Sequence, residues 1–404
     1  MLEKIRKINI KAEVDKNEYP LRSIFIASYY PRKCGIANFT KDLTTAINNL
    51  NPLALAEIIA MDDKEQGDTP YNYPWEVKNR IQRNNPQSYI DAAHYINQSS
   101  ADVVTLQHEF GLFGGTDGDY LLPMLDIINK PIVTCFHSIL PEPDEHKKYI
   151  MKRIIEKSSA VIAMSELSRN LLIDVYDTKD ESAVLIYHGV PDFTFNENAK
   201  YKKLLDVKAD KMLLVSGLIG PGKGIEYVIE AMPAILSEYP KTVFYVVGET
   251  HPDLFKDGID KYRNYLNELV VKHHLEESVK FVNEYVSLEN LIQYYKACDI
   301  YLTPHLDAQQ PTSGTLAYAL GAGKICFSTP YIYAKEMLDK DVGILIPFKD
   351  SASIAEQTIR VFKDETLANK YRNNAYQLGK LMQWPRVAYK YLKLFKVINE
   401  HFNE

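Results

Sequence analysis

Two turns in the second half of the chain have residue types that suit a phosphate group. One contains Gly222 and Lys223 directly before an amphipathic helical period, and the other contains Ser313, Gly314 and Thr315 at the start of a helix. Free N–H groups and the dipole at a helix start favour an anion there, and the lysine adds a positive charge. Two such turns in one domain would suit a diphosphate.

The first turn is similar in spacing to an ATP-binding P-loop but departs from it at one position. Gly217 is followed by four residues and then by Gly222 and Lys223, yet the next residue is Gly224 instead of a serine or threonine. The missing hydroxyl would have held Mg²⁺ beside the β- and γ-phosphates. We therefore expect a phosphate-binding turn rather than an ATPase site, and a loop with a surface lysine is the alternative.

In the first half of the chain, several apolar runs end in polar residues that suit a hydroxyl-rich ligand. These residues are Arg32, Lys33, Gly35, His108, Glu109, His137 and His188. Ligands of open α/β sheets bind at the carboxyl ends of the strands, so we expect this set to line one sheet edge. A metal site is not expected, because the fourth residue after His108 is Leu112 where a zincin motif has histidine. For His137, a buried and hydrogen-bonded core histidine is the alternative.

These residues need a scaffold, and the apolar runs predict two series of strands. The first series is 23–28, 102–107, 131–136, 160–164 and 183–187, and the second is 212–217, 242–248, 279–282, 300–304, 324–329 and 343–348. Continuous β-branched runs that alternate with helical periods are typical of parallel sheets buried on both faces. The predicted fold class is α/β, with two doubly wound, Rossmann-like domains facing a cleft; one large sheet is the alternative.

A polar, charged segment between the two series predicts the domain boundary. We expect an N-terminal domain at 1–195, a linker at 196–210 and a C-terminal domain at 211–380. The amphipathic end of the chain, 381–404, is expected to form a helix with Pro385 in its first turn.

Composition argues against several classes of protein. With 47 Lys and Arg against 53 Asp and Glu, the net charge of −6 makes a nucleic-acid partner unexpected. The four cysteines show no C-x-x-C spacing, which argues against a zinc ribbon or a disulfide framework. No run approaches about 18 apolar residues and the N-terminus is charged, so we expect neither a membrane span nor a signal peptide. The expected location is the cytoplasm.

The order and spacing of these segments resemble the retaining glycosyltransferases of family 4, which have the GT-B fold. The resemblance covers nearly the whole chain and is carried by SYYPRKCGIANFTKDL (28–43), LQHEFGLFGG (106–115), CFHSILPEP (135–143), MSELSRNLL (164–172), YHGVPD (187–192), SGLIGPGKGIEYVIEAM (216–232), YVSLENLIQYYKACDIYLTP (285–304) and SGTLAYALGAGK (313–324). It implies transfer of a hexose, of the mannose or glucose type, from a nucleotide-diphosphate sugar to a saccharide or glycoconjugate acceptor. The nucleotide sugar is then a substrate, and neither a metal nor another cofactor is implied.

The resemblance also implies roles for single residues. Three match catalytic positions: Lys223 at the donor diphosphate, His137 at the transferred sugar, and Gln310. The implied donor-binding residues are Gly35, Gly222, Tyr285, Val286, Ser313, Gly314, Thr315 and Tyr318. On the acceptor side, in the N-terminal domain, they are Arg32, His108 and Glu109. The closing helix is expected to cross back to the first domain.

Three positions depart from the family pattern. Leu218 stands where an arginine is usual, and Gln310 and Tyr318 stand where the family has two glutamates eight residues apart. Gln310 and Tyr318 keep hydrogen-bonding groups, and we expect Arg32 or Lys33 to supply the missing positive charge. The alternative functions are a non-catalytic sugar- or nucleotide-binding protein of this fold, and a GT-B phosphorylase or epimerase. The sequence does not predict the oligomeric state.

Overall fold

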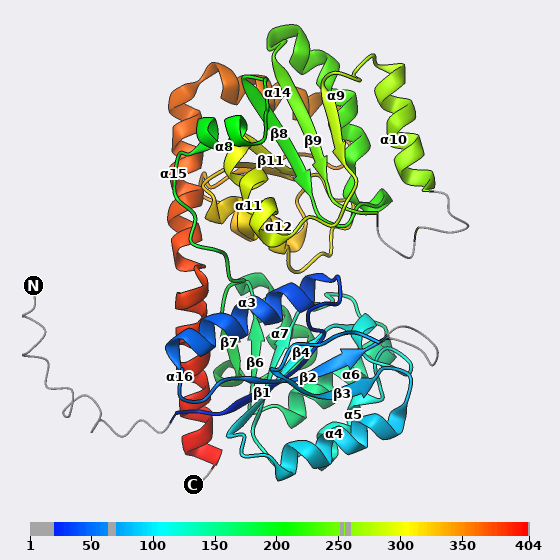
Figure 1. Ribbon diagram of the computed structural model, residues 1–404, viewed down its shortest axis with the longest axis vertical. Helices are drawn as coiled ribbons and strands as arrows, with labels where there is room; N and C mark the ends of the chain where they lie inside the picture. The colour runs from blue at the N-terminus through cyan, green and yellow to red at the C-terminus, as the bar shows by residue number, and fades with distance from the viewer. Residues whose placement is uncertain (1–19, 64–69, 251–253, 255–259, 403–404) are drawn as a thin grey trace, which may run out of the picture.

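A computed structural model describes residues 20–63, 70–250, 254 and 260–402, and this part of the chain contains two parallel β-sheets (Figure 1). The first sheet has the order β3-β2-β1-β4-β5-β6-β7. Its strands are β1 (Ser23–Ala27), β2 (Glu57–Asp62), β3 (Val77–Gln82), β4 (Val103–His108), β5 (Ile132–Phe136), β6 (Ala160–Ala163) and β7 (Ala183–Leu185). Residues 1–19, the start of the expected first domain, and 403–404 lie outside the described residues.

Helices cover both faces of the first sheet. They are α3 (Gly35–Leu50), α4 (Pro86–Gln98), the short η1 (Phe110–Leu112), α5 (Leu121–Ile127), α6 (Glu145–Lys157) and α7 (Glu166–Tyr176). The sulfur of Cys34 caps α3 by accepting a hydrogen bond from the N–H of Ala37 at 3.3 Å. Phe39, Leu43 and Ile47 recur every four residues and are buried against the sheet. This packing places the first turn of α3 at the carboxyl end of β1.

The second sheet has the order β10-β9-β8-β11-β12-β13 and is also parallel. Its strands are β8 (Lys211–Ser216), β9 (Thr242–Val247), β10 (Val279–Val282), β11 (Ile300–Thr303), β12 (Ile325–Ser328) and β13 (Ile344–Leu345). The surrounding helices are η3 (Pro221–Lys223), α9 (Ile225–Glu238), α10 (Lys261–Lys272), α11 (Leu288–Ala297), α12 (Gly314–Gly321), α13 (Ile332–Met337), α14 (Ser351–Lys363) and α15 (Glu365–Leu381). The short η2 (Asp180–Ser182) precedes β7 in the first sheet.

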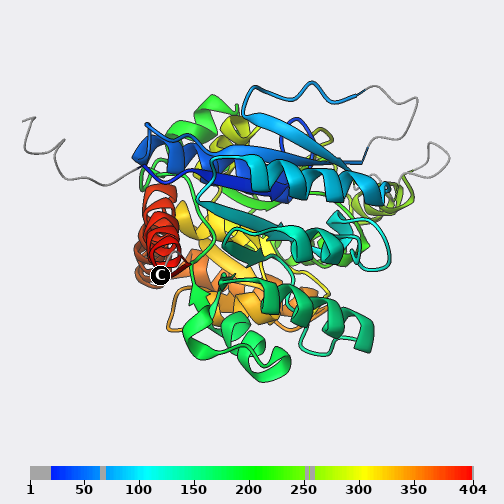
Figure 2. The same cartoon turned by 90° about the horizontal axis from the view of Figure 1, so that it is seen from below.

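Two segments tie the halves of the chain together. The segment 196–210, expected as a linker, contains α8 (Asn198–Leu204), which is anchored to the second half by an ion pair of 2.6 Å between Lys202 and Asp299. At the other end, α16 (Trp384–Phe402) continues from α15 and runs along the first domain (Figure 1). Figure 2 shows α16 nearly end-on at the flank of the first domain. Its Phe395 ring packs edge-on against Phe25 of β1, with centroids 6.3 Å apart.

The two domains are also joined by direct hydrogen bonds. The carboxylate of Glu336 in α13 accepts hydrogen bonds from the N–H groups of Glu166 and Leu167 at 2.9 and 2.8 Å. These are the first residues of α7, where a carboxylate is favoured by the helix dipole. The hydroxyl of Ser168 donates to the carbonyl of Pro311 at 3.2 Å. The contacts fix the start of α7 against the loop before α12.

Candidate active site

The two turns expected to bind phosphate lie against each other. A Cβ placed on Gly217, at the end of β8, would be 3.5 Å from Cγ2 of Thr315 in α12. Leu306 donates its backbone N–H to the carbonyl of Gly222 at 2.9 Å. The structure therefore brings both turns to one edge of the second sheet, as a diphosphate site requires.

The start of α12 presents a positive helix end to the cleft. The hydroxyl of Ser313 caps this helix by accepting from the N–H of Leu316 at 3.3 Å. The first N–H groups of any helix have no acceptor within it and favour an anion. Gly314 lies directly against the first domain, because a Cβ there would be 2.9 Å from Nε2 of His188. Only glycine fits at this position without a shift of the helix or the histidine.

The backbone of the η3 turn holds Lys223 in place. Its N–H donates to the carbonyl of Gly220 at 2.9 Å. The next residue, Gly224, has a φ of 63°, and a Cβ there would collide with the carbonyl oxygen of Pro304. Glycine is thus required by both the backbone conformation and the space. Burial lowers the pKa of the Lys223 ammonium.

A chain of hydrogen-bonded side chains supports Lys223. Its Nζ lies 3.5 Å from Nε2 of His305, whose Nδ1 lies 2.9 Å from Oε1 of Gln310. Gln310 donates through Nε2 to the carbonyl of Thr312 at 2.9 Å. Because an amide oxygen only accepts, Nδ1 of His305 carries the proton and Nε2 accepts from the lysine. Burial, aided by the charge of Lys223, lowers the pKa of His305 to about 3 and keeps the ring neutral.

This chain changes the role expected for Gln310. The sequence placed Gln310 among the catalytic residues, but both polar atoms of its side chain bond within the protein. These contacts place Gln310 behind His305, which in turn lies beside Lys223. His305 was not among the predicted residues, although its position directly after the run 300–304 marks it as a strand-end residue.

Two neutral histidines of the first domain pack against one phenylalanine of α3, and one of them, His188, lies against the start of α12. The ring of Phe39 meets His137 and His188 edge-on, with centroids 4.8 and 5.0 Å away. Burial lowers the pKa of His137 to about 3 and that of His188 to about 4. Nε2 of His137 donates to Oε1 of Gln107 at 2.9 Å, which leaves Nδ1 as an acceptor. Neutral imidazoles can bond sugar hydroxyls without adding a charge beside the diphosphate turns.

Two side chains of α3, which lies on the first domain, bond the two tyrosines of the second domain that were expected at the donor. Asn38 donates to the hydroxyl of Tyr285 at 2.8 Å, and the hydroxyl of Tyr318 donates to the carboxylate of Asp42 at 3.2 Å. Burial raises the pKa of Asp42 to about 6. Asp42 was not predicted, and it places a carboxylate beside Tyr318 from the opposite domain.

The two cations expected to compensate for Leu218 are paired with carboxylates. Lys33 reaches across the cleft but forms an ion pair of 3.1 Å with Glu249. Arg32 pairs with Asp63 at 3.0 Å. The expectation that one of them replaces the missing arginine at Leu218 therefore has no support in these contacts. Among the described residues, Lys223 is the cation that the diphosphate turns themselves carry.

The two remaining residues expected on the acceptor side lie at different depths. Glu109 accepts from the hydroxyl of Ser138 and from the N–H of Phe110, and burial raises its pKa. His108, in contrast, is fully buried. Its ring stacks on Phe113 at 5.9 Å, and neither ring nitrogen has a hydrogen-bond partner in the structure. This position in the core gives His108 no access to an acceptor, because its strand turns that side chain inward.

Other predicted residues surround these groups. Gly35 is the first residue of α3. A Cβ placed on Gly35 or on Gly222 would have no other atom within 4 Å. Val286 packs against the apolar core of the second domain beside Tyr285. Within the described residues, no group of three or more histidines, cysteines or acidic residues could hold a metal ion. In the same part of the chain, no helix combines the length and apolarity that a membrane crossing needs.

The sequence is similar to known glycosyltransferases, and a family model matches the second half of the chain. Residues 196–378 match the family model for glycosyl transferases group 1. An uncharacterized glycosyltransferase of Methanocaldococcus jannaschii is 24% identical over 261 residues, which are 60% of this chain and 61% of that relative. A phosphatidyl-myo-inositol mannosyltransferase of Mycolicibacterium smegmatis is 21% identical over 275 residues, 67% of this chain and 66% of the relative. The chain thus spans less than two thirds of the length of these relatives.

Solved structures resemble nearly the whole chain. HepE of Anabaena in complex with UDP and glucose has a TM-score of 0.72 at 16% identity and covers 93% of this chain and 100% of its own. Sucrose-phosphate synthase of Thermosynechococcus elongatus has a TM-score of 0.74 at 17% identity, covering 94% and 99%. The fold is GT-B. The predicted fold class is therefore confirmed, and the comparisons together support a GT-B glycosyltransferase.

Proposed function

We propose that this GT-B protein transfers a hexose, of the mannose or glucose type, from a nucleotide-diphosphate sugar to a saccharide or glycoconjugate acceptor. The observation that carries the proposal is the meeting of Gly314 at the start of α12 with His188 across the cleft. This contact sets the start of α12, which together with Lys223 suits a diphosphate, against the neutral His188, which suits a sugar. The match of 196–378 to glycosyl transferases group 1 supports the same assignment.

The geometry suggests how the reaction is promoted. As the bond between the sugar and the diphosphate breaks, negative charge grows on the leaving oxygens. The N–H groups at the start of α12 and the ammonium of Lys223 would stabilise such a charge, and because hydrogen bonds within the protein hold both, they would need little reorganisation. His137 and His188 would hold the sugar, so that positioning supplies part of the rate enhancement.

The proposal includes retention of the anomeric configuration and independence from metal ions. In this scheme a phosphate oxygen of the donor takes the proton from the acceptor hydroxyl, which then attacks from the side that the diphosphate leaves. No protein base is required, which agrees with the neutral, low-pKa state of His137 and His188. Both features remain proposals.

Incubation with a panel of nucleotide sugars tests the function. UDP-glucose, UDP-galactose, UDP-N-acetylglucosamine, GDP-mannose and ADP-glucose would be supplied in turn with mixed saccharides, and release of the nucleoside diphosphate would be measured. We expect release with one or a few donors, unchanged by EDTA, and an NMR coupling constant that shows retention. Absence of release with every donor would contradict the proposed enzyme.

A non-catalytic binding protein is the second candidate, favoured by one observation. Gln310 stands where a carboxylate is expected, and both its amide atoms are bonded within the protein. The same panel separates the two functions. Nucleoside diphosphates that raise the melting temperature without any turnover of the corresponding sugar would support the binding protein.

A further inference from the structure

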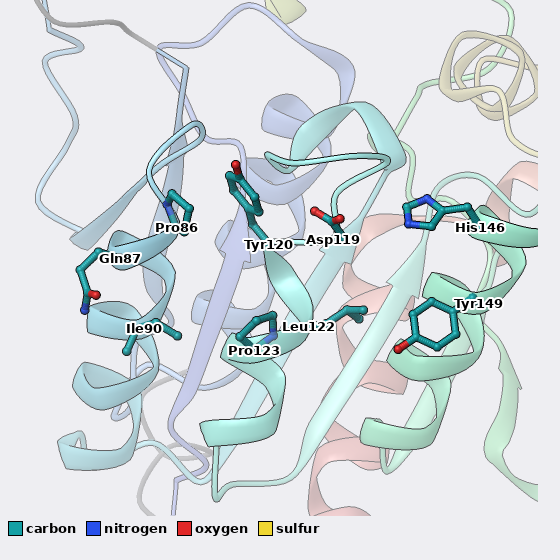
Figure 3. Close-up of a pocket in the computed structure, with 9 residues that line it drawn as sticks. All are labelled: Pro86, Gln87, Ile90, Asp119, Tyr120, Leu122, Pro123, His146 and Tyr149. Atoms are coloured by element: carbon teal, nitrogen blue, oxygen red, sulfur yellow. The ribbon is translucent and has the colours of Figure 1, made fainter.

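We propose that a groove between α4, α5 and α6 binds the part of an oligosaccharide acceptor that extends beyond the transfer cleft, an inference that rests on the proposed function. The groove holds about 480 Å³, within the range of about 300–1,000 Å³ that small-molecule sites occupy. Figure 3 shows side chains from all three helices around it. It lies on the first domain, outside the residues assigned to the donor.

The side chains of the groove have the chemistry that recognises a sugar ring. Tyr120, directly before α5, and Tyr149, in α6, supply aromatic surface, and Leu122 lies between them in Figure 3. Asp119 and His146 add polar groups at one end. A hexose has C–H faces that pack on an aromatic ring and hydroxyls that bond carboxylate and imidazole groups. More than half of the Tyr149 side chain, 54%, is exposed and free to make such a contact.

The groove is built by contacts between its walls. Asp117, in the loop 109–120, pairs with His146 at 3.1 Å and with Lys147 at 3.4 Å, and both partners belong to α6. The same loop is tied to α4, because the hydroxyl of Tyr89 accepts from the N–H of Gly114 at 2.7 Å. The loop is therefore fixed against two helices, and the groove exists before a ligand arrives.

Two loops of the first domain run from the sheet edge that carries His137 to the residues of the groove. Glu109, at the end of β4, and Ser138, after β5, are joined by a hydrogen bond at the sheet edge that carries His137. From there, one loop leads to Asp119 and Tyr120, and the other leads to the α6 residues of the groove. A saccharide that lies along these loops would place its reacting end near His137. The occupant is therefore an acceptor of several sugar units.

Acceptor length tests this inference. Maltose and maltohexaose, mannobiose and mannohexaose, and chitobiose and chitohexaose would be compared as acceptors, with nucleoside diphosphate release as the rate and saturation-transfer NMR as the binding readout. Tyr149→Ala should raise the KM of the accepted hexasaccharide about tenfold, equivalent to about 1.4 kcal/mol, and leave kcat unchanged. The disaccharide and donor hydrolysis without acceptor should be unaffected.

Two further variants control for structure. Tyr149→Phe keeps the ring and should restore most of the affinity for the hexasaccharide. Tyr389→Ala removes an equally exposed tyrosine, 54%, from α16 and should change nothing. An unchanged hexasaccharide KM in a folded Tyr149→Ala protein, or an equal loss for the disaccharide, would overturn the inference.

The NMR readout separates this inference from the proposed function. If the native protein turns over no donor, the transferase proposal fails. Hexasaccharide signals that disappear in Tyr149→Ala would then still support a saccharide groove. If no hexasaccharide of the panel gives a signal with the native protein, the groove proposal is wrong.

Discussion

Replacement of Lys223 by alanine is the sharpest test of the diphosphate site. The ammonium lies at the end of the chain formed by Gln310 and His305, so it is oriented before a donor binds. Loss of one preorganised group that stabilises transition-state charge typically reduces the rate about 10²–10³-fold, or about 3–4 kcal/mol. We expect Lys223→Ala to reduce transfer at least about a hundredfold and to weaken nucleoside diphosphate binding much less.

The same residue predicts a pH dependence. The reaction needs the charged ammonium, and burial lowers the Lys223 pKa from its ordinary 10.5. The rate should therefore fall as the pH rises through that lowered pKa, at a pH below the one expected for an exposed lysine. His305, with a pKa of about 3, stays neutral throughout this range and adds no second step.

Steady-state rates of nucleoside diphosphate release, with melting curves as a check on folding, provide the assay. Lys223→Arg should recover only part of the rate, because a planar guanidinium cannot occupy the place of a compact ammonium beside His305. Lys33→Ala is the matched control, since its exposed ion pair with Glu249 is worth about 0–1 kcal/mol. A folded Lys223→Ala protein with near-normal transfer, or an equal loss in Lys33→Ala, would refute the reasoning.

Two other substitutions test the packing described above. Burial lowers the pKa of His108 from its ordinary 6.5 to about 3 in the folded protein. Its contribution to the stability of the folded state is therefore fully present above pH 6.5. Between pH 6.5 and pH 3 that contribution is lost at about 1.4 kcal/mol per pH unit. His108→Phe should therefore reduce the difference between the free energies of unfolding in urea at pH 7 and pH 5.5, without affecting transfer. A difference as large as in the native protein would contradict this prediction. Gly314→Ala puts a methyl group 2.9 Å from His188 Nε2 and should lower turnover roughly ten- to hundredfold, while Gly111→Ala, in open space, should not. Equal activity of the two alanine variants would contradict this prediction, because it would show that α12 accommodates the added methyl group without loss of turnover.

Most of the fold could be predicted because strands buried on both faces leave continuous apolar runs in the sequence. The run 102–107, for instance, overlaps β4 (Val103–His108), in which every residue is buried. β3 was missed because its sequence, VKNRIQ, is polar and mostly only partly buried at the sheet edge. β2 was also missed, although its sequence, EIIAMD, is almost entirely buried and follows the same apolar pattern. The helix α8 was missed because its stability comes from contacts such as the Lys202–Asp299 pair, which join residues far apart in the sequence.

The sequence predicted that the candidate site lies at the strand ends, but not which side chains contact each other there. The turns that contain Lys223 and Ser313 could be predicted because the conformation of a turn depends on a few neighbouring residues. Whether a strand-end histidine stays partly exposed, as His137 does, or is fully buried, as His108 is, depends on packing that one sequence does not display. The bond between Asp42 and Tyr318 joins two domains, so no local pattern could reveal it.

The return of α16 to the first domain has a consequence for the order in which the protein folds during synthesis. Trp384, Tyr391 and Phe395 belong to the apolar core that also contains Phe25 and Leu43. The ribosome makes these two groups at opposite ends of the chain. Domains usually fold in the order of their synthesis, from the N-terminus onward. Here the first domain emerges first but completes its core last, after the second domain has been made. Its α3 face stays exposed until then.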